Sequence, residues 1–213
     1  MDIFIYLFVA LFSVLNPIGT VPIFVGLTQG YTASERSKTS LVTSINVFII
    51  LMISFFVGQY VLSFFGITIT ALRIAGRIII ASSGFSLLNG NFSKNKGINK
   101  KVQKEVEARQ HIALTPLAMP MLAGPGSISL LIAYYQELGE SGSAITSVEI
   151  LFSCLAILAV AILIYIVLRS AHYLAKILGS SGIVAISRII GFLTIAIGIQ
   201  YIISATLSII RGI

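Results

Sequence analysis

Apolar residues run along this chain in long stretches that are separated by short polar segments. A helix needs about 20 predominantly apolar residues to cross the roughly 30 Å hydrocarbon core of a bilayer. Six stretches are long enough: residues 3–28, 39–65, 67–90, 111–136, 147–169 and 184–209. The pattern therefore predicts an all-α integral membrane protein with six transmembrane helices.

The composition supports this interpretation. Of the 213 residues, 57% are hydrophobic and 10% are charged, whereas about a quarter of the residues in a soluble domain are charged. The mean hydropathy is +1.02. The first apolar stretch follows no basic segment and precedes no clear small-residue cleavage site, so we expect a retained helix and not a signal peptide.

The net charge of +7 is distributed along the chain in a way that argues against a nucleic-acid partner. Ten of the fourteen basic residues lie in alternate connections, after the first, third and fifth stretches. Cytoplasmic loops carry such an excess of Lys and Arg. We therefore expect a multi-pass protein of the cytoplasmic (inner) membrane, in contact with the lipid bilayer, with both termini outside. Residues 91–110 form a basic cytoplasmic linker.

Two of the six stretches contain helix-breaking residues near their middle. The first contains Asn16-Pro17-Ile18-Gly19, and the fourth contains Gly124-Pro125-Gly126-Ser127. Asn is a good N-cap, and Pro suits the first helical position because its missing N–H is no loss there. The two breaks therefore predict discontinuous first and fourth helices, in each of which a new half-helix starts near the midplane. Pro116 and Pro120 should interrupt the first half of the fourth.

The breaks also indicate an internal repeat. Cutting the chain at the linker leaves residues 1–90 and 111–213, with three stretches each, and the breaks fall at matching places. Arg73-Ile74-Ala75-Gly76 in the third stretch recurs as Arg188-Ile189-Ile190-Gly191 in the sixth. Because three is odd, the second half enters the membrane from the opposite side. This predicts a 3+3 inverted repeat, which is a recurrent plan of secondary transporters.

Half-helix starts that face each other near the midplane would attract a small anionic group. Unsatisfied N–H groups cost several kcal/mol in hydrocarbon, so protein, water or a ligand must satisfy them, and helix N-termini bind carboxylates well. Gly19, Gly124 and Gly126 would let a ligand approach the backbone, and the hydroxyls of Thr20 and Ser127 could add contacts. A single break would more simply be a kink or a packing device. Two breaks at equivalent places favour a binding site.

The remaining polar residues leave the coupling of transport open. Arg77, the deepest arginine of the third stretch, either extends to the headgroups or faces the interior and attracts a substrate carboxylate. All seven acidic residues lie at termini, in loops or at the edges of the stretches. Either sodium, held by carbonyl and hydroxyl oxygens, or a proton can be the coupling ion. We expect no cofactor and no metal site, since the two histidines and the single cysteine lie far apart.

The segments NPIGTVPIF (16–24) and TPLAMPMLAGPGSIS (115–129) resemble the MarC family of six-span bacterial and archaeal membrane proteins, which is similar to the LysE-type exporters. The span count and length agree along essentially the whole chain. The resemblance implies a small protein of the cytoplasmic membrane, and some members are described as transporters of small neutral amino acids such as glycine and alanine. The family name reflects an association with antibiotic resistance, which does not by itself establish drug transport.

We therefore expect a secondary transporter that binds a small-molecule substrate of the glycine or alanine type at Asn16–Thr20 and Gly124–Ser127. A passive channel, or an exporter of another small solute or drug, is the alternative. An intramembrane hydrolase is disfavoured, because His172, near the cytoplasmic end of the fifth stretch, should be far from Ser127. A homo-oligomer is compatible with the sequence.

Overall fold

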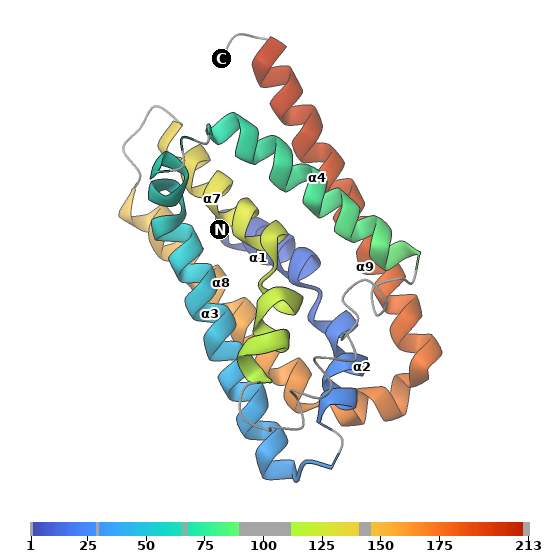
Figure 1. The fold of residues 1–213 in the computed structure, drawn as a ribbon. Helices are drawn as coiled ribbons and strands as arrows, with labels where there is room; N and C mark the ends of the chain where they lie inside the picture. Colours follow the sequence, from blue (N-terminus) through green and yellow to red (C-terminus); the bar gives the residue numbers. More distant parts are fainter. Residues whose placement is uncertain are drawn as a thin grey trace.

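The computed structural model describes residues 2–28, 30–64, 66, 68–89, 112–140 and 146–210. In chain order these form α1 (Asp2–Leu15), α2 (Pro17–Leu27), α3 (Ala33–Phe64), α4 (Ile69–Leu88), the π-helix η1 (Ala113–Leu122), α7 (Pro125–Glu140), α8 (Ser147–Arg169) and α9 (Ala171–Ile210). Every element in these ranges is a helix (Figure 1), so the all-α class is confirmed. The predicted linker 91–110 lies outside the described residues.

Within the described ranges, α3 and α8 are each long and apolar enough to cross a membrane. Two bent pairs would add two more spans if each is one span: α1 with α2, bent by 40°, and the two parts of α9. The second bend lies at Gly179, which has φ 60° and ψ 176°. The candidate spans found among the described residues do not include α4 or the η1–α7 pair. The count of six spans therefore stays a prediction.

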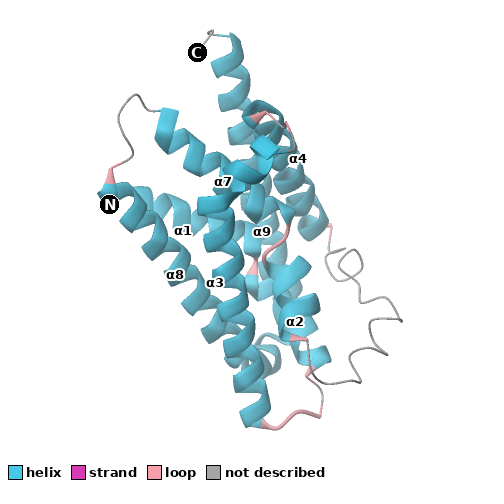
Figure 2. Ribbon diagram, turned by 60° about the vertical axis from the view of Figure 1, so that its left-hand side comes forward, coloured by secondary structure: helices cyan, strands magenta, loops and turns pink. Residues whose placement is uncertain are grey.

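The outer faces of α3 and α8 are apolar, as a lipid-facing surface must be. Helix α3 exposes Ile45, Ile49, Ile53 and Val57, which are spaced by four and so lie on one face. Helix α8 exposes Leu151, Leu155, Leu158, Ile162 and Ile166. The two helices contact each other and run along the long axis of the molecule (Figure 2).

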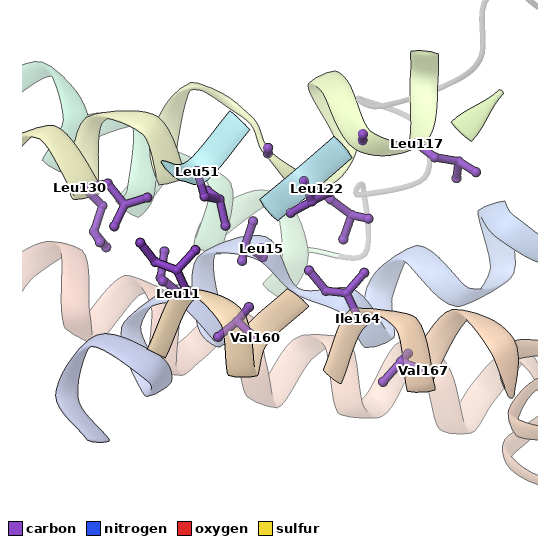
Figure 3. Close-up of a cluster of buried hydrophobic side chains, with 14 of the residues drawn as sticks. Leu11, Leu15, Leu51, Leu117, Leu122, Leu130, Val160, Ile164 and Val167 are labelled. Atoms are coloured by element: carbon purple, nitrogen blue, oxygen red, sulfur yellow. The ribbon is translucent and has the colours of Figure 1, made fainter. Parts of the chain in front are cut away.

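The opposite faces of these helices bury a single cluster of aliphatic side chains (Figure 3). It combines Leu11 and Leu15 of α1, Leu51 of α3, Leu117 and Leu122 of η1, Leu130 of α7, and Val160, Ile164 and Val167 of α8. In a bilayer the alternative environment is lipid and not water, so such side chains stabilise the bundle through close van der Waals packing. The cluster joins the two broken helices to α3 and α8.

Helix α4 packs along α9 at very short range (Figure 1). A Cβ atom added to Gly84 of α4 would lie 2.8 Å from the carbonyl oxygen of Gly191 and 2.8 Å from the backbone nitrogen of Ile195, both in α9. Only glycine fits between the two backbones at this point. The second glycine of the R-I-x-G repeat is thus part of a close helix–helix contact.

Candidate functional site: two helix breaks

The first break lies between α1 and α2, at Asn16. Its backbone is left-handed, with φ 43° and ψ 65°, a conformation that Asn tolerates better than most residues. Its side-chain Oδ1 accepts a hydrogen bond from the Gly19 backbone N–H at 3.1 Å. Pro17 occupies the first position of α2. The prediction that a half-helix starts at Asn16-Pro17 is confirmed, because cap and proline act locally.

The second break lies between η1 and α7, at Ala123 and Gly124. Ala123 leaves the helical region with φ −78° and ψ 74°, and α7 begins at Pro125. The prediction that a half-helix starts at Gly124-Pro125 is confirmed as well. Its cap is different, because Gly124 has no side chain and its carbonyl oxygen accepts from the backbone N–H groups of Ser127 and Ile128.

The segment before this break differs from the prediction. Pro116 and Pro120 were expected to interrupt it, yet η1 continues through both as a π-helix. In this register the Leu117 N–H donates to the Ile112 carbonyl at 3.3 Å, and the Ala123 N–H donates to the Ala118 carbonyl at 2.8 Å. The wider turn gives the Ile112 carbonyl the Leu117 N–H as a donor, whereas in an α-helix Pro116 would leave this carbonyl without one.

The two half-helix starts share a local hydrogen-bond arrangement. The Thr20 hydroxyl donates to the Asn16 carbonyl at 3.3 Å, and the Ser127 hydroxyl donates to the Gly124 carbonyl at 2.9 Å. Both side chains are buried. Each therefore bonds the carbonyl of its own cap residue, which leaves only the hydroxyl lone pairs for other contacts.

Gly19 has a different role from the one that the sequence suggests. A Cβ atom at this position would overlap the side-chain amide of Asn16. The space at Gly19 is therefore taken by the cap residue, and its N–H is bound by the same amide. The N–H groups of Ile18 and Gly126, at the second position of each half-helix, have no acceptor within their own helix.

Asn16 carries a further donor. Its side chain is fully buried, and Nδ2 has no hydrogen-bond partner among the described residues. Leaving such a donor unpaired costs about 1–3 kcal/mol. The first break therefore presents an unpaired amide donor at a helix start whose Gly19 N–H is already bound by the same side chain.

The two breaks lie in the middle of the molecule and border the same core (Figure 1). Leu15, just before the first break, and Leu122 and Ala123, at the second, belong to one buried cluster. Helix α1 contacts α7, and α2 contacts η1. The first part of each broken helix thus lies beside the second part of the other, so the two run antiparallel.

A side chain from α9 completes the first break. Pro17 has no N–H, so the Ser13 carbonyl loses the donor that an unbroken helix would provide. The Thr194 hydroxyl is fully buried and lies 3.1 Å from that carbonyl oxygen and 2.8 Å from the Ile190 carbonyl oxygen, so the two acceptors share its single hydrogen. Sequence reasoning missed Thr194. The only signal was Pro17, which implies that a donor is needed without saying where it comes from.

The other predicted site residues are placed as follows. Pro17 and Gly126 are buried, Gly124 is partly exposed and Pro125 is exposed. The backbone of Arg77 lies in α4, but its side chain lies outside the described part of the structure, so its direction stays open. Within the described ranges no group of three or more His, Cys, Asp or Glu side chains could hold a metal ion.

Comparison with known proteins shows the family. The model of the MarC family of integral membrane proteins matches residues 1–210. The chain belongs to the MarC family. It is 36% identical over 207 residues to the UPF0056 membrane protein YhcE of Escherichia coli K12, a match that covers 97% of this chain and 93% of the relative.

Two further relatives have similar coverage. The inner membrane protein MarC of Escherichia coli ATCC 8739 is 38% identical over 209 residues, with 95% of this chain and 93% of the relative covered. A UPF0056 membrane protein of Buchnera aphidicola is 40% identical over 204 residues, with 94% and 90% covered. No solved structure matches. With its apolar helices, this MarC-family chain is a multi-pass protein of the inner membrane.

Proposed function

We propose that this protein is a secondary transporter of small neutral amino acids, and that the two half-helix starts hold the substrate carboxylate. The single observation that carries the proposal is the Asn16 side chain, which is fully buried and leaves its Nδ2 donor unpaired at the start of α2. A buried donor without a partner points to a ligand that supplies the acceptor.

The donors and acceptors at the breaks suit a zwitterion. Nδ2 of Asn16 and the N–H groups of Ile18 and Gly126 can donate to carboxylate oxygens, and the positive ends of two helix dipoles favour the same charge. The hydroxyl oxygens of Thr20 and Ser127, whose hydrogens are used at the caps, can accept from an ammonium group. The preference for glycine or alanine rests on the family resemblance.

The packing of the helices supports the proposed 3+3 inverted repeat. The broken pair α1–α2 contacts the broken pair η1–α7, α3 contacts α8, and α4 contacts α9. Each element of the first half thus packs against its counterpart in the second half. The site would then lie between the two repeats, where secondary transporters of this plan bind their substrates.

The substitution Asn16→Asp tests this proposal with little change to the fold. Asp tolerates the left-handed backbone and can still accept from the Gly19 N–H, so the helix start is kept. The Nδ2 donor is replaced by a charged acceptor that repels a carboxylate. Loss of a hydrogen bond to a charged group costs about 1.5–3 kcal/mol, which corresponds to roughly 10- to 100-fold weaker binding.

We expect the N16D protein in lipid nanodiscs to bind radiolabelled glycine at least 10-fold more weakly than wild type at pH 7. Binding should recover as the pH falls, because a protonated carboxyl group donates again. Ile53, which lies on the exposed apolar face of α3, provides a matched control: its change to Leu should keep the wild-type affinity. Unchanged glycine affinity in the folded N16D protein at pH 7 would remove Asn16 from the site.

A further inference from the structure

A second group of unpaired donors lies at one end of the molecule, away from the two breaks. Here α2 ends, α3 begins and α9 begins, and both ribbon views place these three ends together (Figures 1 and 2). The unpaired donors belong to Tyr31 and Arg36, and His172 is at the same end of the molecule. The imidazole ring of His172 meets the buried Phe24 ring edge-on, with centroids 6.5 Å apart, which holds α9 against α2.

Two donors of this group are enclosed without a partner. Nε of Arg36 and the hydroxyl group of Tyr31 are buried, and neither has a hydrogen-bond partner among the described residues. Both side chains are only partly exposed, and Tyr31 packs against the hydrophobic core. The Arg36 charge also acts on His172, so these two side chains lie near each other.

The neighbouring polar groups are satisfied by one another and do not supply the missing acceptor. The Glu35 carboxylate accepts from the Thr32 backbone N–H at 2.7 Å and from the Thr32 hydroxyl at 2.9 Å, which caps the start of α3. The Thr28 hydroxyl donates to the Phe24 carbonyl at 2.7 Å. The unpaired donors therefore need an acceptor from outside this group.

We propose that Arg36 and Tyr31, with His172 beside them, bind the phosphate group of an anionic lipid. A guanidinium N–H and a phenol O–H both donate, and arginine matches the geometry and charge of phosphate oxygens. The group lies at the end that carries Arg36, Lys38, Arg169 and Lys176, the expected cytoplasmic side, where anionic headgroups attract basic residues. A free phosphate ion has the same chemistry and is the alternative source.

The experiment compares the thermal unfolding of the full-length protein in nanodiscs of phosphatidylcholine alone with nanodiscs that also contain phosphatidylglycerol. We expect phosphatidylglycerol to raise the melting temperature of wild type by about 2–4 °C. The gain should be lost in Arg36→Gln and reduced in Tyr31→Phe. Lys38→Gln is the matched control, because it removes the same charge from an exposed site two residues away, and it should keep the gain.

A second measurement covers the case in which Arg36→Gln does not fold. Native mass spectrometry of the Tyr31→Phe protein should show less retained phosphatidylglycerol per molecule than wild type, with Lys38→Gln unchanged. Inorganic phosphate, titrated into phosphatidylcholine nanodiscs, distinguishes the source: a gain in wild type that Tyr31→Phe reduces assigns the site to free phosphate. Equal loss of the lipid effect in Arg36→Gln and Lys38→Gln, or retention in both Arg36→Gln and Tyr31→Phe, would overturn the proposal.

Discussion

The hydrogen bond from Thr194 to Ser13 offers a sharp test of how the first break is held. Replacing Thr194 by Val keeps the shape of the side chain and removes the hydroxyl group that, among the described residues, donates to the Ser13 carbonyl. The Ile190 carbonyl, the second acceptor of this hydroxyl, lies inside a regular helix and keeps its backbone donor. The substitution therefore leaves the Ser13 carbonyl without a donor among the residues that the structure describes.

The size of the effect follows from this geometry. An orphaned buried acceptor costs about 1–3 kcal/mol in soluble proteins, whereas interhelical hydrogen bonds in membrane proteins average about 0.6 kcal/mol and reach about 1.7. Since Pro17 removes the alternative donor, we expect a value near the upper end, about 1–2 kcal/mol. For a chain of this length that lowers the melting temperature by roughly 2–8 °C.

The assay is thermal unfolding of purified protein in lipid nanodiscs, with glycine affinity measured on the same samples. Thr194→Ser keeps the hydroxyl group and should restore most of the stability. Thr28→Val is a matched control, because Thr28 is also fully buried and donates to a carbonyl within its own helix, that of Phe24. It should cost less than Thr194→Val. Because Ser13 lies three residues before Asn16, we also expect weaker glycine binding in Thr194→Val and a return of affinity in Thr194→Ser.

If Thr194→Val is as stable as wild type, or costs no more than Thr28→Val, the hydroxyl does not compensate for Pro17 and the reasoning fails. Loss of stability with an unchanged glycine affinity would confine Thr194 to a structural role.

Two further substitutions test the packing and the site. Gly84→Ala should destabilise the protein by about 1–3 kcal/mol, because the new Cβ meets the α9 backbone at Gly191 and Ile195. Gly26→Ala is the control and should be tolerated, because a Cβ at Gly26 meets nothing within 4 Å. Thermal melting curves of the two variants check this, and equal stability would contradict the close α4–α9 contact. Gly126→Leu should abolish glycine binding while the protein stays in the membrane, because the leucine side chain blocks approach to the start of α7. Glycine-binding assays and membrane fractionation measure the two effects, and retained glycine affinity would exclude Gly126 from the site.

The starts of α2 and α7 could be predicted from sequence because their causes are local. Asn16 is the cap of α2 and Pro17 is its first residue. At the second break, Gly124 precedes Pro125, the first residue of α7. The all-α class follows equally directly from the length of the apolar stretches.

Other features depend on partners far along the chain or on a choice of helical register. Pro116 and Pro120 show that an α-helix is disfavoured, but not that a π-helix replaces it. The bond between Thr194 and Ser13 joins residues 181 positions apart. The chain turns at Ser170 and bends again at Gly179. His172 therefore lies in the first part of α9 and not at the end of the fifth stretch.

The role of the hydroxyl groups also needed the structure. From sequence, Thr20 and Ser127 are polar groups beside the breaks whose hydroxyls could add contacts to a ligand. In the fold each hydrogen is used at its own cap, so their oxygens face a ligand only as acceptors. As acceptors they suit an ammonium group and not a carboxylate.

Uptake of radiolabelled glycine and alanine into proteoliposomes tests the central claim most directly, with sodium and proton gradients imposed separately. We predict uptake that saturates, is competed by unlabelled substrate, responds to one of the two gradients and is strongly reduced in the Asn16→Asp protein. An absence of uptake under every gradient with folded protein, or rapid flux that does not saturate, would contradict a coupled carrier for these amino acids.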